Sequence, residues 1–329
     1  MTNASSPRDH GGNLDAAILR FGGAPEDWVD LSTGINAQPY PVPDIPADRW
    51  NALPRKSDMA ALCQAAQVAY RTNAPVVALA GAQGAIQIVP YLRPLGEARV
   101  LTPTYNEHAG ALRAAGWRVT EVSHPDALRG ADVAIVVNPN NPDGASYPPD
   151  FLADLAQDVG LLVVDESFGD PTPELSLAPR LDRLPENVLL LRSFGKFYGL
   201  AGLRLGFALA HPALAARIAA MAGPWPVCGP AIEIAIAALN DQDWQTETIA
   251  RLSAEAARLD ALAARAGWQL VGGTVLFRTY AAPDATEAQN QLARAHIWTR
   301  IFPYSAKWIR LGLPGTSEAW ARLEAALAR

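Results

Sequence analysis

The sequence contains little of what marks a secreted protein or a protein that binds nucleic acid. Its 329 residues include only 2 cysteines, Cys63 and Cys228, which form neither a disulfide framework nor a metal-binding cluster. We therefore expect a cytoplasmic protein with no bound metal. The formal net charge is −6 and no run of lysine or arginine is present, so nucleic acid is not an expected partner.

Long uninterrupted hydrophobic segments are also missing. The first residues carry no apolar stretch of the kind found in signal peptides. The most apolar segment, residues 208–222, is interrupted by His211, Pro212 and Arg217, so we expect no membrane span. Because 50% of the residues are hydrophobic, the chain can form the cores of one large and one smaller soluble domain.

Short apolar runs alternate with helical patterns through residues 76–207. This alternation predicts an α/β domain with a mostly parallel sheet. The expected strands are residues 76–80, 99–102, 119–122, 133–138, 161–165, 188–192 and 205–209, and the expected helices are 85–92, 108–115 and 149–158. In such sheets ligands bind outside the carboxyl ends of the strands, so the residues that follow each run are the candidates for a site.

Beyond Pro212 the pattern changes to that of a smaller α+β domain. Helices are expected at residues 231–239, 244–266 and 318–328, and strands at 268–271, 275–279, 297–302 and 308–313. We predict three parts: an N-terminal arm or lid at residues 1–30, a large domain at 31–211 and a small domain at 212–329. The arm is expected to contain one short helix, at residues 14–21.

The segment SFGKFYGLAGLRLG, from Ser193 to Gly206, places Lys196 among small and apolar residues. A lysine carries covalent chemistry when its amine is deprotonated or joined to a cofactor. Ser193 and Arg204 are the hydroxyl and guanidinium donors that suit a phosphate. Together they indicate that Lys196 holds pyridoxal 5′-phosphate (PLP), whereas a lone lysine in a glycine-rich loop would be an ordinary surface residue.

Further cofactor-binding candidates follow the expected strands. Gly81, Ala82 and Gln83 open a helix, where unpaired backbone N–H groups bind phosphate. Tyr105 follows the next strand and can stack on a pyridine ring. Asp165 ends an apolar run and can keep the ring nitrogen protonated, which makes the ring an electron sink.

In their order and spacing these pieces resemble the fold type I PLP enzymes, the aspartate aminotransferase-like class I and II family. The resemblance extends over nearly the whole chain and implies a homodimer with its active site at a two-fold interface. It also implies that Asn141, in NPNNPDG, donates to the ring oxygen and that Arg310 binds the substrate carboxylate. Arg300 is a second candidate for binding substrate, although a solvated arginine on an edge strand is nearly as good an interpretation.

Three positions depart from the pattern of this family. Phe168 stands where many aminotransferases have a tyrosine that donates to the ring oxygen, and Gly195 stands where many have a serine. Leu53 stands where relatives have a tyrosine that reaches the phosphate of the partner subunit. We therefore do not expect a generic aminotransferase.

The motifs HGGN at residues 10–13 and DLSTGIN at residues 30–36 resemble the threonine-phosphate decarboxylases of cobalamin biosynthesis. That resemblance implies a small phosphorylated amino acid as substrate, L-threonine O-3-phosphate, and (R)-1-amino-2-propanol O-2-phosphate as product. It implies substrate contacts from His10, Asn13, Gly34 and Asn36, although by composition alone the first motif would be a tail with turn residues. Histidinol-phosphate aminotransferases share the fold and most cofactor residues, so transamination of a phosphorylated amine stays open as the alternative.

Overall fold

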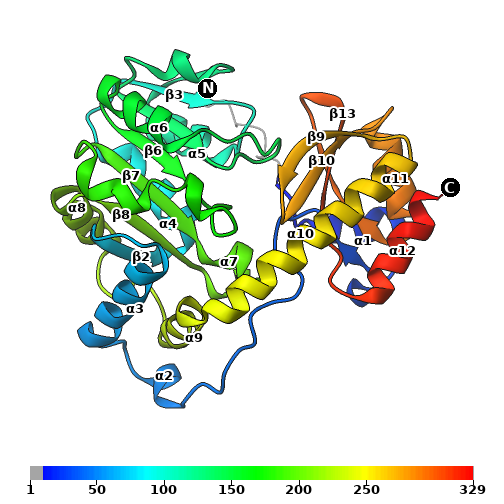
Figure 1. Cartoon of the computed structure of the whole chain (residues 1–329), viewed down its shortest axis with the longest axis horizontal. Coiled ribbons are helices and arrows are strands. Elements are labelled where there is room, and N and C mark those ends of the chain that lie inside the picture. The colour runs from blue at the N-terminus through cyan, green and yellow to red at the C-terminus, as the bar shows by residue number, and fades with distance from the viewer. Residues whose placement is uncertain (1–9, 329) are drawn as a thin grey trace.

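The seven-stranded sheet of the large domain is built from the apolar runs identified above (Figure 1). The computed structural model describes residues 10–328 and orders the strands β2-β8-β7-β6-β5-β3-β4. The strands are β2 Val76–Ala80, β3 Glu97–Leu101, β4 Arg118–Val122, β5 Val133–Val137, β6 Leu162–Asp165, β7 Val188–Ser193 and β8 Leu205–Ala210. All seven predicted strands are confirmed, with small shifts at their ends.

One strand of this sheet, β8, runs against its two neighbours. It pairs antiparallel with β2 and with β7, whereas the remaining pairs are parallel. The start of β8 therefore lies at the same edge as the ends of β2 and β7. In the register of the sheet, Gly206 is opposite Ser193 and Leu205 is opposite Ala80, so the residues around these three strand ends meet at one site.

Helices bury both faces of the sheet, and the side chains of the strands alternate accordingly. Along β6, Leu162 and Val164 belong to one hydrophobic cluster and Val163 to another, as expected for a sheet covered on both sides. The helices of this part are α2 Asp48–Asn51, α3 Lys56–Ala69, α4 Gly81–Ile88, α5 Glu107–Ala114, α6 Pro149–Leu155, α7 Phe194–Phe197, α8 Pro212–Ala222 and α9 Gly229–Asn240.

The small domain contains an antiparallel sheet of order β12-β13-β10-β9 and three helices. Its strands are β9 Gln269–Thr274, β10 Phe277–Ala281, β12 Arg300–Phe302 and β13 Ser305–Gly312, and its helices are α10 Gln242–Arg265, α11 Ala285–Ala293 and α12 Ser317–Leu327. Arg300 on β12 is the register partner of Arg310 on β13, so the two predicted substrate arginines are neighbours. Within residues 10–328, no helix combines the length and the apolar character needed to cross a membrane.

The N-terminal arm packs on the small domain. Its helix α1 (Leu14–Phe21) has the predicted bounds, and Ala17 of this helix forms a cluster with Trp28 and with Ala293 of α11. Strand β1 (Val29–Asp30) continues the arm and pairs with β11 (Ile297–Trp298), after α11. The arm is thus joined to the small domain by both apolar packing and backbone pairing.

The boundary predicted at residue 212 does not coincide with a change in packing. Helix α8 packs against β2, β8 and α4, and α9 packs against α3, so both belong to the large domain. The long helix α10 runs from the large domain to the small one (Figure 1). We propose that the small domain begins within α10, because the apolar residues of α8 and α9 are buried against the large sheet and α3.

Candidate active site

Two cavities meet at Lys196, at the sheet edge where β8 begins. The inner cavity has a volume of about 200 Å³ and the outer one about 670 Å³, and Lys196, Tyr105, Asn141 and Phe168 line both. All the predicted cofactor residues line the inner cavity: Gly81, Ala82, Gln83, Tyr105, Asn141, Asp165, Ser193, Lys196 and Arg204. Four predicted substrate residues line the outer cavity: His10, Gly34, Arg300 and Arg310.

Lys196 lies on α7, the four-residue helix that follows β7. Removal from solvent lowers the pKa of its amine to about 8, and the positive charge of Arg310 acts in the same direction. A larger fraction of this amine is therefore neutral near pH 7 than for an ordinary lysine. A neutral amine is the form that can form a covalent bond with an aldehyde or accept a proton.

The phosphate end of the inner cavity is formed where β2, β7 and β8 meet. Gly81 begins α4 with a φ of 75°, a conformation that favours glycine. A Cβ at this position would lie 3.1 Å from the Arg204 guanidinium. The glycine thus leaves space between the first N–H groups of α4 and Arg204, with Ser193 on the same cavity wall. Such a set of donors fits a phosphate.

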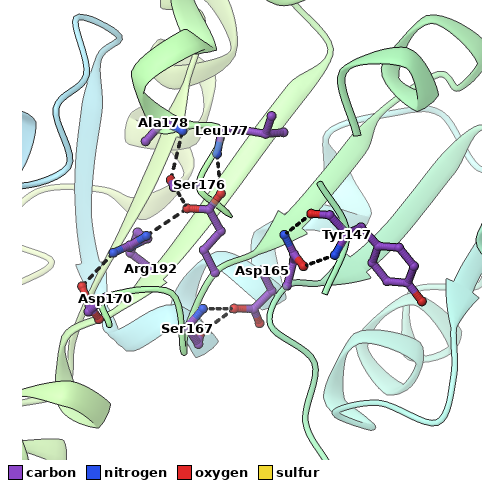
Figure 2. Close-up of polar contacts among 10 residues, drawn as sticks. Tyr147, Asp165, Ser167, Asp170, Ser176, Leu177, Ala178 and Arg192 are labelled. Carbon is purple, nitrogen blue, oxygen red and sulfur yellow. Dashed lines mark hydrogen bonds and ion pairs between the residues drawn. The ribbon is translucent and has the colours of Figure 1, made fainter. Parts of the chain in front are cut away.

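Asp165 is buried at the end of β6 and accepts hydrogen bonds at both carboxylate oxygens. Its Oδ2 lies 2.9 Å from Nε2 of His108. Its Oδ1 accepts the backbone N–H of Ser167 at 2.9 Å and the Ser167 hydroxyl, as Figure 2 shows. Burial alone would raise the pKa of Asp165, but the hydrogen bonds from His108 and Ser167 outweigh it, so the pKa is lowered. The carboxylate is therefore held ionised, as a partner for a protonated pyridine nitrogen should be.

Our sequence reasoning missed both partners of Asp165. His108 lies one helical turn beyond Tyr105, and Ser167 lies two residues after Asp165. The available signal for His108 was its position, three residues after Tyr105 and at the start of a helix. The sequence does not show which strands are neighbours, so this position did not identify Asp165 as the partner of His108.

A buried ionic network fixes the ends of β6 and β7 relative to each other. Arg192 donates to Glu166 at 2.9 Å and to Asp170 at 2.7 Å. Figure 2 shows Arg192 beside Asp170 and near the chain at Ser176. Glu166 directly follows Asp165, and Arg192 directly precedes Ser193. The network therefore holds the backbone next to these two cofactor candidates, although Glu166, Arg192 and Asp170 do not line the cavity.

Arg310 is buried, lines the outer cavity and contacts the segment around Ser32. One of its terminal nitrogens donates to Oδ1 of Asn141, and the other donates to the Ser32 carbonyl at 2.6 Å. Burial, together with neighbouring Arg300, lowers the pKa of Arg310 to about 10. Its Nε has no hydrogen-bond partner among residues 10–328. An anion in the outer cavity would offset the cost of burying this cation.

The arm passes over the outer cavity and contacts residues from both domains. Nε2 of His10 lies 3.0 Å from Oε1 of Glu107, and the His10 carbonyl accepts from Arg300 at 2.9 Å. Gly11 runs so close to Ser32 that a Cβ would lie 2.3 Å from its carbonyl oxygen. The other oxygen of Glu107 accepts from Gln83 at 3.1 Å, so the arm is linked to the inner cavity.

Two predicted substrate residues line neither cavity. Oδ1 of Asn13 accepts the N–H of Ala16 at 3.3 Å and caps α1. Asn36 is buried, and its side chain bonds instead to Phe197, Gln38 and Arg251. We therefore do not propose direct substrate contacts from Asn13 and Asn36, because Oδ1 of Asn13 caps α1 and both ends of the Asn36 amide are engaged elsewhere.

Comparison with known proteins places the chain in a family. Residues 55–327 match the family described as aminotransferase class I and II. The chain belongs to this family. It is 44% identical over 326 residues to threonine-phosphate decarboxylase of Pseudomonas aeruginosa, covering 97% of each protein. It is 43% identical over 333 residues to threonine-phosphate decarboxylase of Sinorhizobium sp, covering 99% of each.

A solved structure shares the same architecture. Histidinol-phosphate aminotransferase from Sinorhizobium meliloti, in complex with pyridoxal 5′-phosphate, matches with a TM-score of 0.78 at 21% identity, over 98% of this chain and 94% of that one. At this identity the likeness shows the fold. Family membership and the two relatives identify PLP as the cofactor of this class I and II member, and the donors around the inner cavity fit it.

Proposed function

We propose that this protein is a PLP-dependent threonine-phosphate decarboxylase, which converts L-threonine O-3-phosphate into CO2 and (R)-1-amino-2-propanol O-2-phosphate for cobalamin biosynthesis. The observation that supports this proposal most strongly is the 43–44% identity to two such decarboxylases over nearly the full chain. The site agrees with it, because a cavity that fits PLP adjoins an outer cavity lined by Arg300, Arg310 and His10. Such a cavity suits a substrate with an anion at each end.

We propose roles for most of the cofactor candidates from their places in the inner cavity. Ser193, Arg204 and the first N–H groups of α4 would hold the phosphate, Lys196 would bind the cofactor covalently and Asp165 would pair with the ring nitrogen. When bound, PLP supplies an electron sink for the bond that is broken at the substrate Cα. Oδ1 of Asn141 accepts from Arg310, and the amide nitrogen of Asn141 would donate to the ring oxygen.

From the residues of the outer cavity we propose how the substrate is oriented. Arg310 is buried beside Lys196 and Asn141, so we assign it the carboxylate. We assign the substrate phosphate to His10 of the arm and to Arg300, which donates to the His10 carbonyl. By holding the carboxylate, Arg310 would determine which bond at Cα is presented for cleavage. After CO2 leaves, a proton must be delivered to Cα, and the Lys196 amine at the junction of the two cavities is the group placed to deliver it.

We also propose that the protein works as a cytoplasmic homodimer. Large apolar side chains are exposed around the contact of α2 with α9, namely Trp50, Leu53 and Trp225, which are 68%, 65% and 54% exposed. Exposed apolar groups of this size are typical of surfaces that pack against a second copy. Light scattering at assay concentrations should give twice the mass of one chain, and a fully active monomer would contradict the proposal.

The decisive experiment incubates the purified holoenzyme with L-threonine O-3-phosphate, with and without 2-oxoglutarate. Release of CO2 without the keto acid supports the decarboxylase. Turnover that requires the keto acid, with no CO2, would instead indicate an aminotransferase. Lys196→Ala is the matched control, since it should stay folded and lose turnover. A borohydride-reducible PLP adduct at another lysine in that variant would contradict the assignment of Lys196.

A further inference from the structure

The end of α7, the helix that carries Lys196, is closed by a residue from far away in the sequence. Helix α7 spans Phe194–Phe197, so its last carbonyl groups have no partners within the helix. Asn36 binds two of them: its backbone N–H donates to the Lys196 carbonyl at 3.0 Å, beside the N–H of Gly199 at 3.2 Å, and its Nδ2 donates to the Phe197 carbonyl at 3.0 Å. The backbone of Lys196 is therefore held directly by Asn36.

The other end of the Asn36 amide is held by α10. Oδ1 of Asn36 accepts from a terminal nitrogen of Arg251 at 3.0 Å and from the N–H of Gln38 at 3.1 Å. Asn36 is only 2% exposed, and its neighbours on the two sides are a carbonyl acceptor and a cationic donor. Only one orientation of the amide satisfies both. Arg251 and the N–H of Gln38 therefore both favour the orientation in which Nδ2 points at α7.

The segment around Asn36 is attached to the small domain on one side and to the Lys196 segment on the other. The carbonyl of Leu31 accepts from the N–H of Gly312, and the Gln38 side chain donates to the carbonyl of Gly315 at 2.9 Å. The N–H of Tyr40 donates to the carbonyl of Tyr198 at 2.9 Å. In Figure 1 this segment runs beside α10 towards α2. Its position thus depends on where the small domain lies.

From these contacts we propose that Asn36 is a positioning residue, which with Arg251 transmits the placement of the small domain to Lys196. The inference rests on the proposed role of Lys196 as the cofactor lysine. Asn36 lines neither cavity and acts through the backbone of α7. Small displacements of a reacting group change rates strongly, so a shift of α10 relative to the large domain would alter the reach of the Lys196 amine.

The variant Arg251→Met tests whether Arg251 acts on Lys196, and Glu255→Gln is its control. Arg251 also pairs with Glu255 at 3.1 Å, so Glu255→Gln removes that ion pair and leaves the bond to Asn36. Arg251→Met should lower kcat about tenfold with KM little changed, the effect of losing one hydrogen bond from a charged donor. In the apoprotein it should also change the pH-dependent rate at which an amine reagent labels Lys196, measured by mass spectrometry. Glu255→Gln should leave both within about twofold.

A double-mutant cycle with Asn36→Ala shows whether Arg251 acts through Asn36. If it does, Arg251→Met has no further effect on kcat or on Lys196 labelling in the Asn36→Ala background. Additive effects would overturn the proposal. If Asn36→Ala does not fold, Asn36→Ser serves in its place, because it keeps a small polar side chain and the backbone N–H.

Asn187→Ala separates positioning from stability. Asn187 donates from its amide to the carbonyls of Ala156 and Val159, so its loss removes comparable bonds away from Lys196. It should lower the melting temperature without changing Lys196 labelling, and the Asn36 variants should change both. Equal labelling in wild type and the Asn36 variants would refute the proposal. The labelling uses apoprotein, so it stays informative even if the decarboxylase assay fails.

Discussion

Nε2 of His108 lies 2.9 Å from Oδ2 of Asp165, and both side chains are buried. The contact joins α5 to the end of β6, so a helix above the sheet edge controls the charge of a residue in the inner cavity. With Ser167 on the other oxygen, Asp165 is stabilised as a carboxylate by three donors. The proposed function depends on that charge, and so do two of the predictions below.

Asp165→Asn should retain PLP but lose most of the activity. The amide has nearly the same shape as the carboxylate but carries no charge to keep the ring nitrogen protonated, so kcat should fall by about a hundredfold or more. Steady-state kinetics of the holoenzyme measure this, with cofactor content followed by absorbance. Asp260→Asn, in the small domain, is the control. Near wild-type turnover in Asp165→Asn would rule out the assigned role.

His108→Phe should move the acid limb of the pH–rate profile. Its imidazole helps to lower the pKa of Asp165, so removing it raises that pKa, and activity should be lost at a higher pH as the solution is acidified. We also expect kcat at the optimum to fall about tenfold, the effect of losing one hydrogen bond to a charged group. His211→Phe changes a histidine bound to the carbonyl of Leu184 and should leave the profile in place.

Lys196→Met should stabilise the apoprotein at neutral pH. The folded-state pKa of Lys196, about 8, lies below the ordinary lysine pKa of 10.5, so the unfolded chain binds more protons between these values. Burying the ammonium therefore costs up to about 3 kcal/mol below pH 8, and the cost disappears as the pH rises towards 10.5. Denaturant unfolding at pH 7 and pH 10 measures the difference. The exposed Lys307→Met should show no such trend.

Removing residues 1–13 should weaken phosphothreonine binding without disturbing the cofactor. Of the described residues of this segment, 10–13, none lines the inner cavity, whereas His10 and Gly11 line the outer one. We expect KM for phosphothreonine to rise and kcat to fall, together reducing kcat/KM by about tenfold or more. Any reaction of unphosphorylated threonine should be little affected. Unchanged constants for phosphothreonine would show that the arm takes no part.

Gly11→Ala provides a point variant of the same prediction. A Cβ at Gly11 would lie 2.3 Å from the Ser32 carbonyl oxygen, so the arm must shift away from Ser32. The variant should reproduce part of the loss seen on truncation, with PLP content unchanged. If Gly11→Ala behaves as wild type while the truncation does not, the lost contacts come from other residues of the arm.

The strands and the cofactor residues were predictable because their signals are local. Each strand is a short apolar run, and each cofactor candidate lies at or near the end of one, except Arg204, which precedes β8. Helices α3, α8 and α11 were not assigned. In α3 the buried side chains are only Leu62, Ala65 and Ala66, and alanine-rich faces give weak periodicity. The predicted role of Asn13 overlooked a readable signal, since asparagine immediately before a helix commonly caps it.

What the sequence could not predict are contacts between distant residues. His108 and Asp165 are 57 positions apart, and Asn36 and Phe197 are 161 apart. No pattern along the chain links such pairs, because they meet only after the sheet and the small domain have formed. The same holds for the ionic network of Glu166, Arg192 and Asp170. The residues that touch the cavities were largely recoverable, but those that hold them in place were not.

The pairing of Ser193 with Gly206 also limits how the segment between them can change in length. Both residues belong to neighbouring strands whose register is set by backbone hydrogen bonds, and a Cβ at Gly206 would lie 2.3 Å from the amide nitrogen of Ala82. Inserting or deleting one residue would either slide a strand, which moves each of its side chains to the opposite face of the sheet, or displace Lys196 and Arg204. Variants of altered length in this segment should therefore be rejected in any library selected for soluble protein.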